Sequence, residues 1–304
     1  MIDKIPIKVL KSIDSIESDN TSGSITLAKK STETFLLLSE ENCSFDQIIN
    51  TARSLLNAQP TMASIFNLCN NLLFNIKKNN KEYYSENVNN YCKKFLLDLE
   101  NSDKSASKIA NKLINNNSTI VTHSFSSTVL NTLLHAKNSG LDFNVICTES
   151  RPKNEGVKLA KILGNNHIKV KLIVDSSIFS FLSDADLTII GADAITSAGI
   201  INKIGTLGLA AYNYQLKKPT YALGSNIKFL PNSFKLKLHQ KKNPKEIISS
   251  KILNVTAVNY YFDLTPLTFF TGVVTEEKIL NPSEIKQKIN HLKIHNNLLN
   301  FSRF

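Results

Sequence analysis

The chain of 304 residues has no tryptophan, four cysteines, two methionines, ten glycines and eight prolines. So few cysteines exclude a disulfide scaffold, and so little glycine and proline excludes a collagen-like chain. Hydrophobic residues make up 42% and charged residues 20%, which is typical of a globular protein with a sizeable core and excludes a wholly disordered chain. At about 100–200 residues per domain, we expect one large domain or two ordinary ones.

Long apolar runs are also missing. No run approaches the roughly 20 residues of a membrane helix, and the first 15 residues lack the apolar core of a signal peptide, which spans about 7–15 residues. We therefore expect a cytoplasmic protein without membrane contact. The cysteines lie far apart in apolar stretches with no CxxC pair, which predicts reduced core thiols rather than metal ligands or disulfides. No metal and no cofactor is expected.

Arginine is scarce, with Arg53, Arg151 and Arg303 the only three. This composition indicates that lysine has replaced arginine wherever a point charge is enough, so a retained arginine is a candidate for bidentate anion binding. We favour Arg151 for that task. The net charge of +11 is also uneven, because residues 1–115 carry 14 basic and 13 acidic side chains whereas residues 116–304 carry 22 and 12.

The chain divides into two halves by the period of its apolar residues. Residues 1–115 repeat at helical spacing and predict a helical domain. The expected helices cover 24–39, 45–56 after a Ser44 cap, 62–76 and 88–99. Residues 116–304 predict a parallel sheet covered by helices on both faces. The expected strands are 119–121, 143–147, 169–174, 187–190 and 220–223, with helices within 125–139, 153–163 and 203–216.

Polar segments follow the predicted strands, and no GxGxxG fingerprint or P-loop is present. They are Thr122–Thr128, Thr148–Pro152, Asp175–Ser177, Gly191–Asp193 and Asn202–Thr206, the last expected to open a helix. Ligands of open parallel sheets bind at this edge, and helix N-termini attract anions. The convergence of five such segments predicts a phosphorylated small-molecule ligand, although ordinary helix capping explains any one of them.

Single residues within these segments differ in how strongly the sequence favours a functional role for them. Asp193 stands at a strand end, where a carboxylate can move a proton. Lys203 is a candidate phosphate partner. His123 we interpret as a packed histidine rather than a catalyst.

Four stretches resemble one superfamily: THSFSSTVL (122–130), TESRPKNEG (148–156), GADAITSAGIINKIGT (191–206) and FDLTPLTFFTGVVTEE (262–277). This superfamily contains the alpha, beta and delta subunits of translation initiation factor 2B and the archaeal relatives of these subunits. It also contains two enzymes, ribose-1,5-bisphosphate isomerase and methylthioribose-1-phosphate isomerase. QPTMASIFNL (59–68) and TSGSITLAKK (21–30) extend the resemblance into the helical half. It implies an α/β fold, with a helical domain over 1–115 and a Rossmann-like domain over 116–304. It also implies a homo-oligomer, of the dimer or hexamer-of-dimers type, formed through the C-terminal domain.

The departures from the isomerase pattern concern the site. The isomerase aspartate is present as Asp193, but Ser124 stands at the position of the isomerase cysteine. Gln59 replaces a typical arginine, and the basic phosphate loop reads Thr21, Ser22, Gly23 and Ser24, without its arginine. The ligand-binding residues that match the pattern are Ser126, Ser127, Thr128, Asn202, Lys203 and Lys228.

A serine hydroxyl is far less acidic than a thiol, whose pKa is about 8.5, and needs an adjacent base. We therefore favour the initiation-factor branch: a non-catalytic or weakly catalytic protein that binds a sugar phosphate or nucleotide and acts in translation initiation or its regulation. Subunits of translation initiation factor 2 would then be partners. The alternative is an aldose–ketose isomerase of ribose 1,5-bisphosphate or a related sugar, using Asp193 with Ser124, while Arg151, Asn202, Lys203 and Lys228 hold phosphates and hydroxyls.

The lysine-rich stretch 228–251 suggests RNA contact as a third hypothesis. We favour a solvated face instead, because lysine is common throughout the chain.

Overall fold

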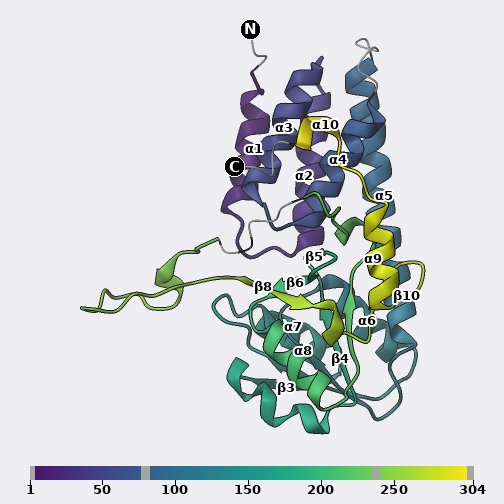
Figure 1. Ribbon diagram of the computed structural model, residues 1–304, viewed down its shortest axis with the longest axis vertical. Helices are drawn as coiled ribbons and strands as arrows, with labels where there is room; N and C mark the ends of the chain where they lie inside the picture. Colours follow the sequence, from purple (N-terminus) through teal and green to yellow (C-terminus); the bar gives the residue numbers. More distant parts are fainter. Residues whose placement is uncertain (1–3, 77–82, 235–237, 239, 300–304) are drawn as a thin grey trace.

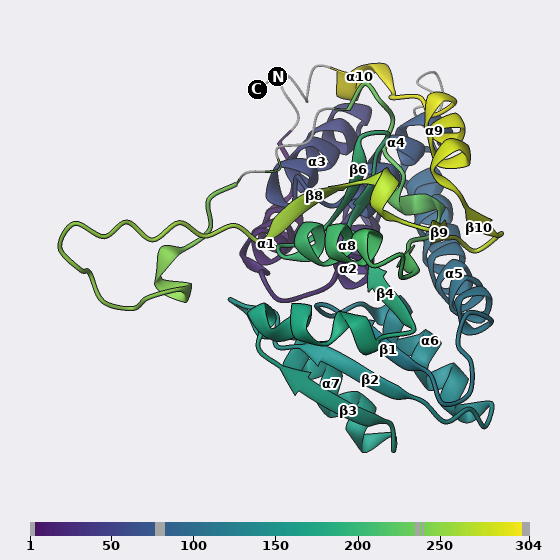
Figure 2. The same ribbon diagram turned by 60° about the horizontal axis from the view of Figure 1, so that its bottom comes forward.

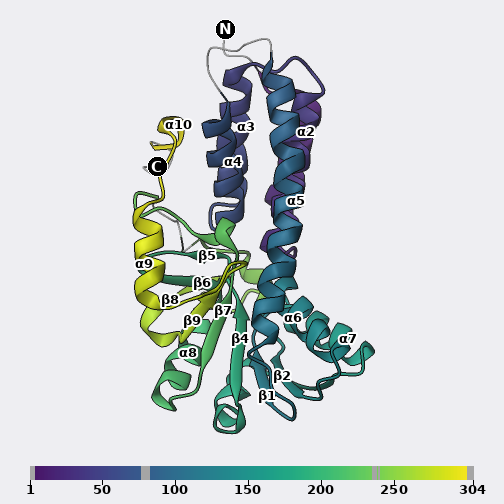
Figure 3. The same cartoon turned by 90° about the vertical axis from the view of Figure 1, so that its right-hand side faces the viewer.

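The computed structural model describes residues 4–76, 83–234, 238 and 240–299. A bundle of helices occupies one end of the molecule and a sheet covered by helices the other, as Figure 1 shows. The long helix α5 (Tyr84–Asn111) runs from the bundle down to the sheet (Figure 3). The two halves are therefore joined by a continuous helix.

The helical half confirms the predicted helices and adds one. Its other members are α1 (Ile7–Ser18), α2 (Ser24–Ser39), α3 (Phe45–Ala58) and α4 (Ala63–Asn75). Ser44 caps α3 as predicted: its hydroxyl accepts from the Gln47 amide, and the Gln47 side chain accepts from the Ser44 amide. The added helix, α1, was not predicted, and it buries Val9, Ile13 and Ile16 against the bundle.

Helix α5 is longer than the predicted 88–99. Its last turns carry polar residues that interrupt the apolar stripe, yet Asp103 and Ser107 are buried there. The Asp103 carboxylate accepts hydrogen bonds from the Thr128 hydroxyl and, at 2.7 Å, from the Asn131 amide. The polar face of α5 is therefore buried against α6 (Ser127–Asn138), which an apolar period does not reveal.

The main sheet has seven strands in the order β10-β9-β7-β4-β1-β2-β3. They are β1 (Thr119–Thr122), β2 (Asn144–Thr148), β3 (Lys169–Ile173), β4 (Leu187–Gly191), β7 (Thr220–Leu223), β9 (Gly272–Val274) and β10 (Ile279–Leu280). All neighbours pair in parallel except β9 and β10. The predicted α/β fold class is confirmed.

Both faces of this sheet are covered. Ile120, Val145 and Ile189 pack against α5, α6 and α7 (Glu155–Asn165). Val121 and Ile146 point the other way, toward α8 (Thr206–Gln215) and the short helix that follows β3. Successive strand residues alternate between two buried faces, which explains why these strands are almost continuously apolar.

A second sheet corrects one prediction. Asn202 and Lys203 do not open a helix: they end strand β6 (Gly199–Lys203), which pairs antiparallel with β5 (Ala194–Ile195) and β8 (Phe262–Pro266). Helix α8 starts only at Thr206. Asp263 on β8 accepts from the amides of Gly205 and Leu207, so the cap of α8 comes from a strand distant in sequence.

The C-terminal segment returns to the helical half (Figure 1). After α9 (Pro282–Asn290), Ile294 and Leu298 of the segment leading into and through α10 (Asn296–Leu299) join the core of the bundle. Arg53 on α3 donates to the carbonyl of Asn297 at 3.0 Å. This retained arginine therefore ties two distant segments together, and Arg303 lies outside the described residues.

Three further features bear on function. The segment from about 240 to 260 leaves the body of the molecule as an extended arm, seen best in Figure 2.

All four cysteines are buried and unpaired, in agreement with their prediction as core thiols. In the described part of the chain, no helix combines the length and the apolarity that crossing a membrane requires.

Candidate functional site

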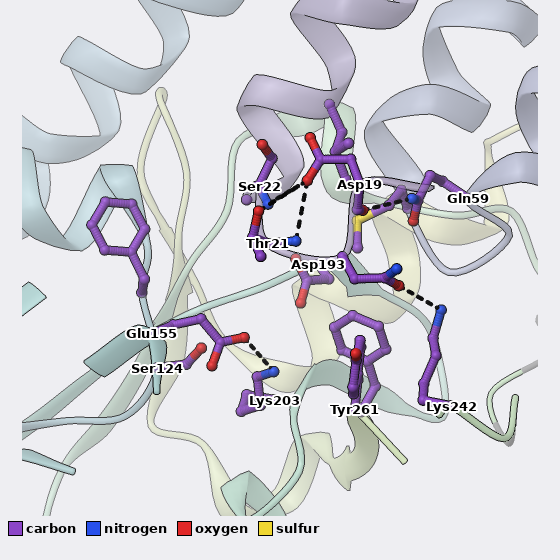
Figure 4. Close-up of a pocket in the computed structure, with 16 residues that line it drawn as sticks. Asp19, Thr21, Ser22, Gln59, Ser124, Glu155, Asp193, Lys203, Lys242 and Tyr261 are labelled. Atoms are coloured by element: carbon purple, nitrogen blue, oxygen red, sulfur yellow. Dashed lines mark hydrogen bonds and ion pairs between the residues drawn. The ribbon is translucent and has the colours of Figure 1, made fainter. Parts of the chain in front are cut away.

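A pocket lies where the helical half meets the carboxyl ends of β1 and β4 (Figure 4). The predicted site residues that line it are Thr21, Ser22, Gly23, Gln59, Ser124, Asp193 and Lys203. The structure thus brings together residues predicted from both halves of the chain.

The loop between α1 and α2 forms one wall. Its centre is Asp19, whose Oδ1 accepts from the amides of Thr21 (3.1 Å) and Ser22 (2.9 Å), while Oδ2 lies 2.6 Å from Nζ of Lys30. Burial acts to raise the pKa of Asp19, but the hydrogen bonds from Lys30 and Ser22 outweigh it and hold the pKa well below its usual range. Asp19 is therefore a permanent anion in this wall.

Gln59 lies behind that loop. Its Nε2 donates to the carbonyls of Ile16 (2.8 Å) and Asp19 (3.0 Å), at the end of α1. Both amide protons are occupied by the protein itself, so Gln59 shapes the wall and has no proton left for a ligand.

On the sheet side, Ser124 follows β1 with a left-handed backbone, at a φ of 69°. Its amide donates to Ser150 Oγ at 2.8 Å. Its neighbour His123 is buried and faces away: Nε2 lies 2.9 Å from the carbonyl of Ile204 and Nδ1 lies 2.7 Å from Thr148 Oγ1. The carbonyl can only accept, so Nε2 carries the proton and Nδ1 accepts from Thr148. Burial lowers the pKa of His123, as a packed neutral histidine requires.

Asp193 follows β4 and the glycine–alanine pair at its end. Burial raises the pKa of its carboxyl group, and the lysines Lys228 and Lys203 oppose that rise. Lys228 is itself buried, where its Nζ donates to the hydroxyl of Ser24 and to the carbonyl of Ala192 at 2.8 Å. Lys228 and Ser24 therefore support Asp193 from beneath the pocket wall. A carboxyl group in this setting can hold or release a proton closer to neutral pH.

Lys203 forms the floor beside two aromatic rings. Its Nζ lies 2.5 Å from Oε1 of Glu155 and 4.8 Å from the ring centre of Tyr261. Glu155 begins α7, and its second oxygen, Oε2, is buried with no hydrogen-bond partner among the described residues. That oxygen can accept a hydrogen bond from a ligand hydroxyl.

The base of the projecting arm closes the pocket. Lys242 extends over the ring of Tyr261 at 5.1 Å and donates to Asn20 Oδ1 at 3.3 Å. Glu246 holds the base in place, with Oε2 2.6 Å from the Tyr261 hydroxyl and Oε1 2.6 Å from Nζ of Lys153. The arm is therefore anchored by the same residues that form the pocket rim.

The other predicted residues lie outside the pocket lining. Ser126 caps α6 by accepting from the Val129 amide, Ser127 begins that helix, and Thr128 bonds to Asp103. Asn202 is buried and donates to Thr206. Arg151 is exposed, and its Nη2 reaches the carbonyl of Glu246 at 3.4 Å instead of the pocket.

Asp175 does not reach the pocket either. Its carboxylate accepts from the amides of Ser150 and Arg151 and so fixes the turn after β2. Of the lysines in the 228–251 stretch, Lys228 is buried and Lys242 reaches into the pocket, whereas Lys241, Lys245 and Lys251 are exposed. Lys235 and Lys237 lie outside the described residues.

Several lining residues were not predicted from the sequence: Asp19, Asn20, Leu27, Met62, Phe125, Glu155, Lys242, Tyr261 and Phe262. Glu155 lay within the family-like stretch 148–156, and its place at the start of a helix after a strand was a usable signal. Lys242 carried no such signal, because it is one lysine in a lysine-rich segment.

Comparison with known proteins identifies the family. The model of the initiation factor 2 subunit family matches residues 16–282. The chain belongs to this family. A Pyrococcus furiosus protein named as a translation initiation factor eIF-2B subunit 2-like protein is 35% identical over 291 residues, covering 91% of this chain and 98% of the relative. A ribose 1,5-bisphosphate isomerase of Archaeoglobus fulgidus is 30% identical over 283 residues, covering 90% of each.

Solved structures of the family agree with the fold. The translation initiation factor eIF-2B structure from Pyrococcus horikoshii superimposes with a TM-score of 0.80 at 31% identity, covering 91% of this chain and 98% of that one. A chain of the tetrameric eIF2B-beta2-delta2 complex from C. thermophilum superimposes with a TM-score of 0.74 at 19% identity, covering 90% of this chain and 92% of that one. This complex shows that proteins of this fold form oligomers. The family thus contains relatives named as initiation factors and relatives named as isomerases at similar identity to this chain.

Proposed function

We propose that this protein binds a phosphorylated sugar or nucleotide in the pocket at the carboxyl edge of the sheet, without isomerising it at an appreciable rate. The observation that supports this proposal most is that the histidine next to Ser124 cannot act as its base. By the family resemblance Ser124 stands at the position of the isomerase cysteine, and the adjacent histidine, His123, has both ring nitrogens engaged by Thr148 and Ile204. A serine needs an adjacent base to exchange protons well, and His123 cannot be that base.

Aldose–ketose isomerisation is the second candidate, and Asp193 is the observation that favours it. The reaction moves one proton between neighbouring carbons and another between their oxygens, so it needs groups that exchange protons near neutral pH. Asp193 has a raised pKa and sits beside Lys203, which suits one of these steps. The second relay would have to be Ser124, and this is why we rank the isomerase below the binding protein.

Isothermal titration calorimetry of the full chain tests the binding proposal. The probes are ribose 5-phosphate, ribose 1,5-bisphosphate and adenosine monophosphate, with unphosphorylated ribose as the control. We expect a saturable heat with at least one phosphorylated probe and none with ribose. If every phosphorylated probe gives only the heat of dilution, the binding proposal is wrong.

We also infer a homo-oligomer formed through the C-terminal half, acting in translation initiation with factor 2 subunits as partners. Support comes from apolar side chains left exposed on that half: Phe179 and Tyr212, whose rings meet edge to face at 5.7 Å, and Leu207 on the same helix as Tyr212. Light scattering of the purified chain measures the mass of the assembly in solution. The Leu207→Glu variant should give a smaller assembly than the wild-type chain. Co-purification with factor 2 subunits tests the partner.

A further inference from the structure

The wall formed by the α1–α2 loop already holds an anion, the carboxylate of Asp19. The amides of Thr21 and Ser22 and the Thr21 hydroxyl, at 3.2 Å, all donate to its Oδ1. Its Oδ2 forms an ion pair with Nζ of Lys30. The Asp19 side chain is only 9% exposed. The Asp19 carboxylate thus occupies the amides of Thr21 and Ser22, the Thr21 hydroxyl and the ammonium group of Lys30.

The base of the projecting arm brings a second cation, Lys242, to the same loop. Among the described residues, no carboxylate lies within ion-pair distance of the Lys242 ammonium group. Its contacts are neutral, the Asn20 amide oxygen at 3.3 Å and the Tyr261 ring at 5.1 Å. Lys203, by contrast, is already paired with Glu155 at 2.5 Å. Lys242 is therefore the pocket cation best able to take a new anionic partner.

The part of the pocket around Lys203 and Asp193 carries acceptor oxygens. Glu155 Oε2 is buried without a described partner, and the Asp193 carboxyl group faces the same pocket, as Figure 4 shows. Carboxylate oxygens accept hydrogen bonds from hydroxyl groups and repel phosphate. This part of the pocket suits the hydroxyls of a sugar.

We propose that the pocket selects a sugar carrying a single phosphate group, which Lys242 binds, and that Asp19 excludes a second phosphate from the α1–α2 loop. The inference rests on the proposed function, because it takes this pocket as the ligand site. Asp19 acts as a specificity determinant by occupying the donors that a second phosphate would need and by repelling its charge in a partly buried site. The sugar hydroxyls donate to Glu155 and Asp193.

Calorimetry at fixed ionic strength with ribose 5-phosphate and ribose 1,5-bisphosphate tests the selection. We expect the full chain to bind the monophosphate about tenfold more tightly, which is the effect of one charge-assisted hydrogen bond. Asp19→Ala vacates the loop donors and frees Lys30, so affinity for the bisphosphate should rise about tenfold while the monophosphate affinity stays about constant. Asp19→Asn keeps an acceptor oxygen in the loop and should give a smaller increase.

Lys242→Met tests whether Lys242 binds the phosphate group. It should weaken monophosphate binding about tenfold, whereas Lys241→Met, at the exposed neighbouring position, should leave it unchanged. Thermal melting of each variant checks that the fold is retained, and Asp19→Asn serves if Asp19→Ala does not fold.

The outcomes separate this inference from the proposed function. If the wild-type chain binds both sugars equally and neither Asp19 variant changes their ratio, the inference is overturned while the binding proposal stands. If Lys242→Met and Lys241→Met behave alike, Lys242 does not bind the phosphate and the inference is again overturned. If neither sugar binds and only the nucleotide does, the pocket keeps its binding role but not the ligand class inferred here. If no phosphorylated probe binds, both proposals are wrong.

Discussion

Gly156 offers a direct test of how the pocket is built. It is the second residue of α7 and packs against the end of β2. A Cβ placed on it would overlap the carbonyl oxygen of Thr148 and lie 2.9 Å from the Thr148 carbonyl carbon and 3.0 Å from Ser150 Oγ. Gly164, near the other end of the same helix, has nothing within 4 Å of the same position. The same substitution should therefore have opposite effects at the two sites.

The magnitudes follow from packing and helix propensity. Gly156→Ala meets backbone atoms that cannot rotate away, so it should cost about 3 kcal/mol, the upper part of the usual range for overpacking. With an unfolding entropy of about 2.1 cal/mol/K per residue, a chain of 304 residues shifts by about 1.6 °C per kcal/mol, so the melting temperature should fall by about 5 °C. Gly164→Ala removes a flexible residue from an exposed helical position and should stabilise the protein by about 0.5–1 kcal/mol.

Thermal unfolding followed by circular dichroism measures both variants. Gly156→Ala should also weaken ligand binding, because Ser150 supports the Ser124 amide at 2.8 Å and Glu155 precedes the substituted residue. If both variants shift the melting temperature by the same amount, α7 does not pack closely on β2. Glu155 would then have no fixed place in the pocket floor.

Three further outcomes are expected. Thr128→Val removes a donor from the buried Asp103 and should cost about 1–3 kcal/mol in urea unfolding, against little change for Ser127→Ala. The fold lowers the pKa of Asp19, so its charge stabilises the protein above the ordinary pKa of about 3.9. The stability advantage of wild type over Asp19→Asn should therefore shrink as the pH falls below about 4 in urea titrations. Ser124→Cys should react with a thiol reagent faster than the four buried native cysteines, and a bound sugar phosphate should protect it.

Much of the fold could be predicted because its signals are local. The apolar runs of β1 and β4 and the helical periods of α2, α3 and α4 depend on residues close together in sequence. The rule that ligands bind at the carboxyl ends of parallel strands then led to Ser124 and Asp193 at one edge of the sheet. These two residues line the same pocket.

The missed features depend on distant partners. Asp263 caps α8 from another strand, so nothing near Asn202 and Lys203 revealed that they belong to β6. Lys242 enters the pocket because Glu246 anchors the arm to Tyr261 and Lys153. A single sequence shows the residue types but not these pairings.

Arg151 shows the limit of rarity as a guide to function. Its scarcity made it a candidate for anion binding, and the strand-end rule placed it near the site. The turn that carries it directs the side chain to the base of the arm, where it meets the Glu246 carbonyl at 3.4 Å. We therefore propose that Arg151 helps to hold the arm, while Lys242 supplies the pocket cation.

Phosphorus NMR of the protein mixed with ribose 5-phosphate and then with ribose 1,5-bisphosphate tests most directly whether the protein binds without isomerising. We predict that the monophosphate resonance shifts or broadens on binding and that no new resonance appears over hours, because a serine stands at the proposed proton-transfer position and His123 cannot activate it. The appearance of a ketose phosphate resonance from either sugar would contradict this prediction and make the protein an isomerase.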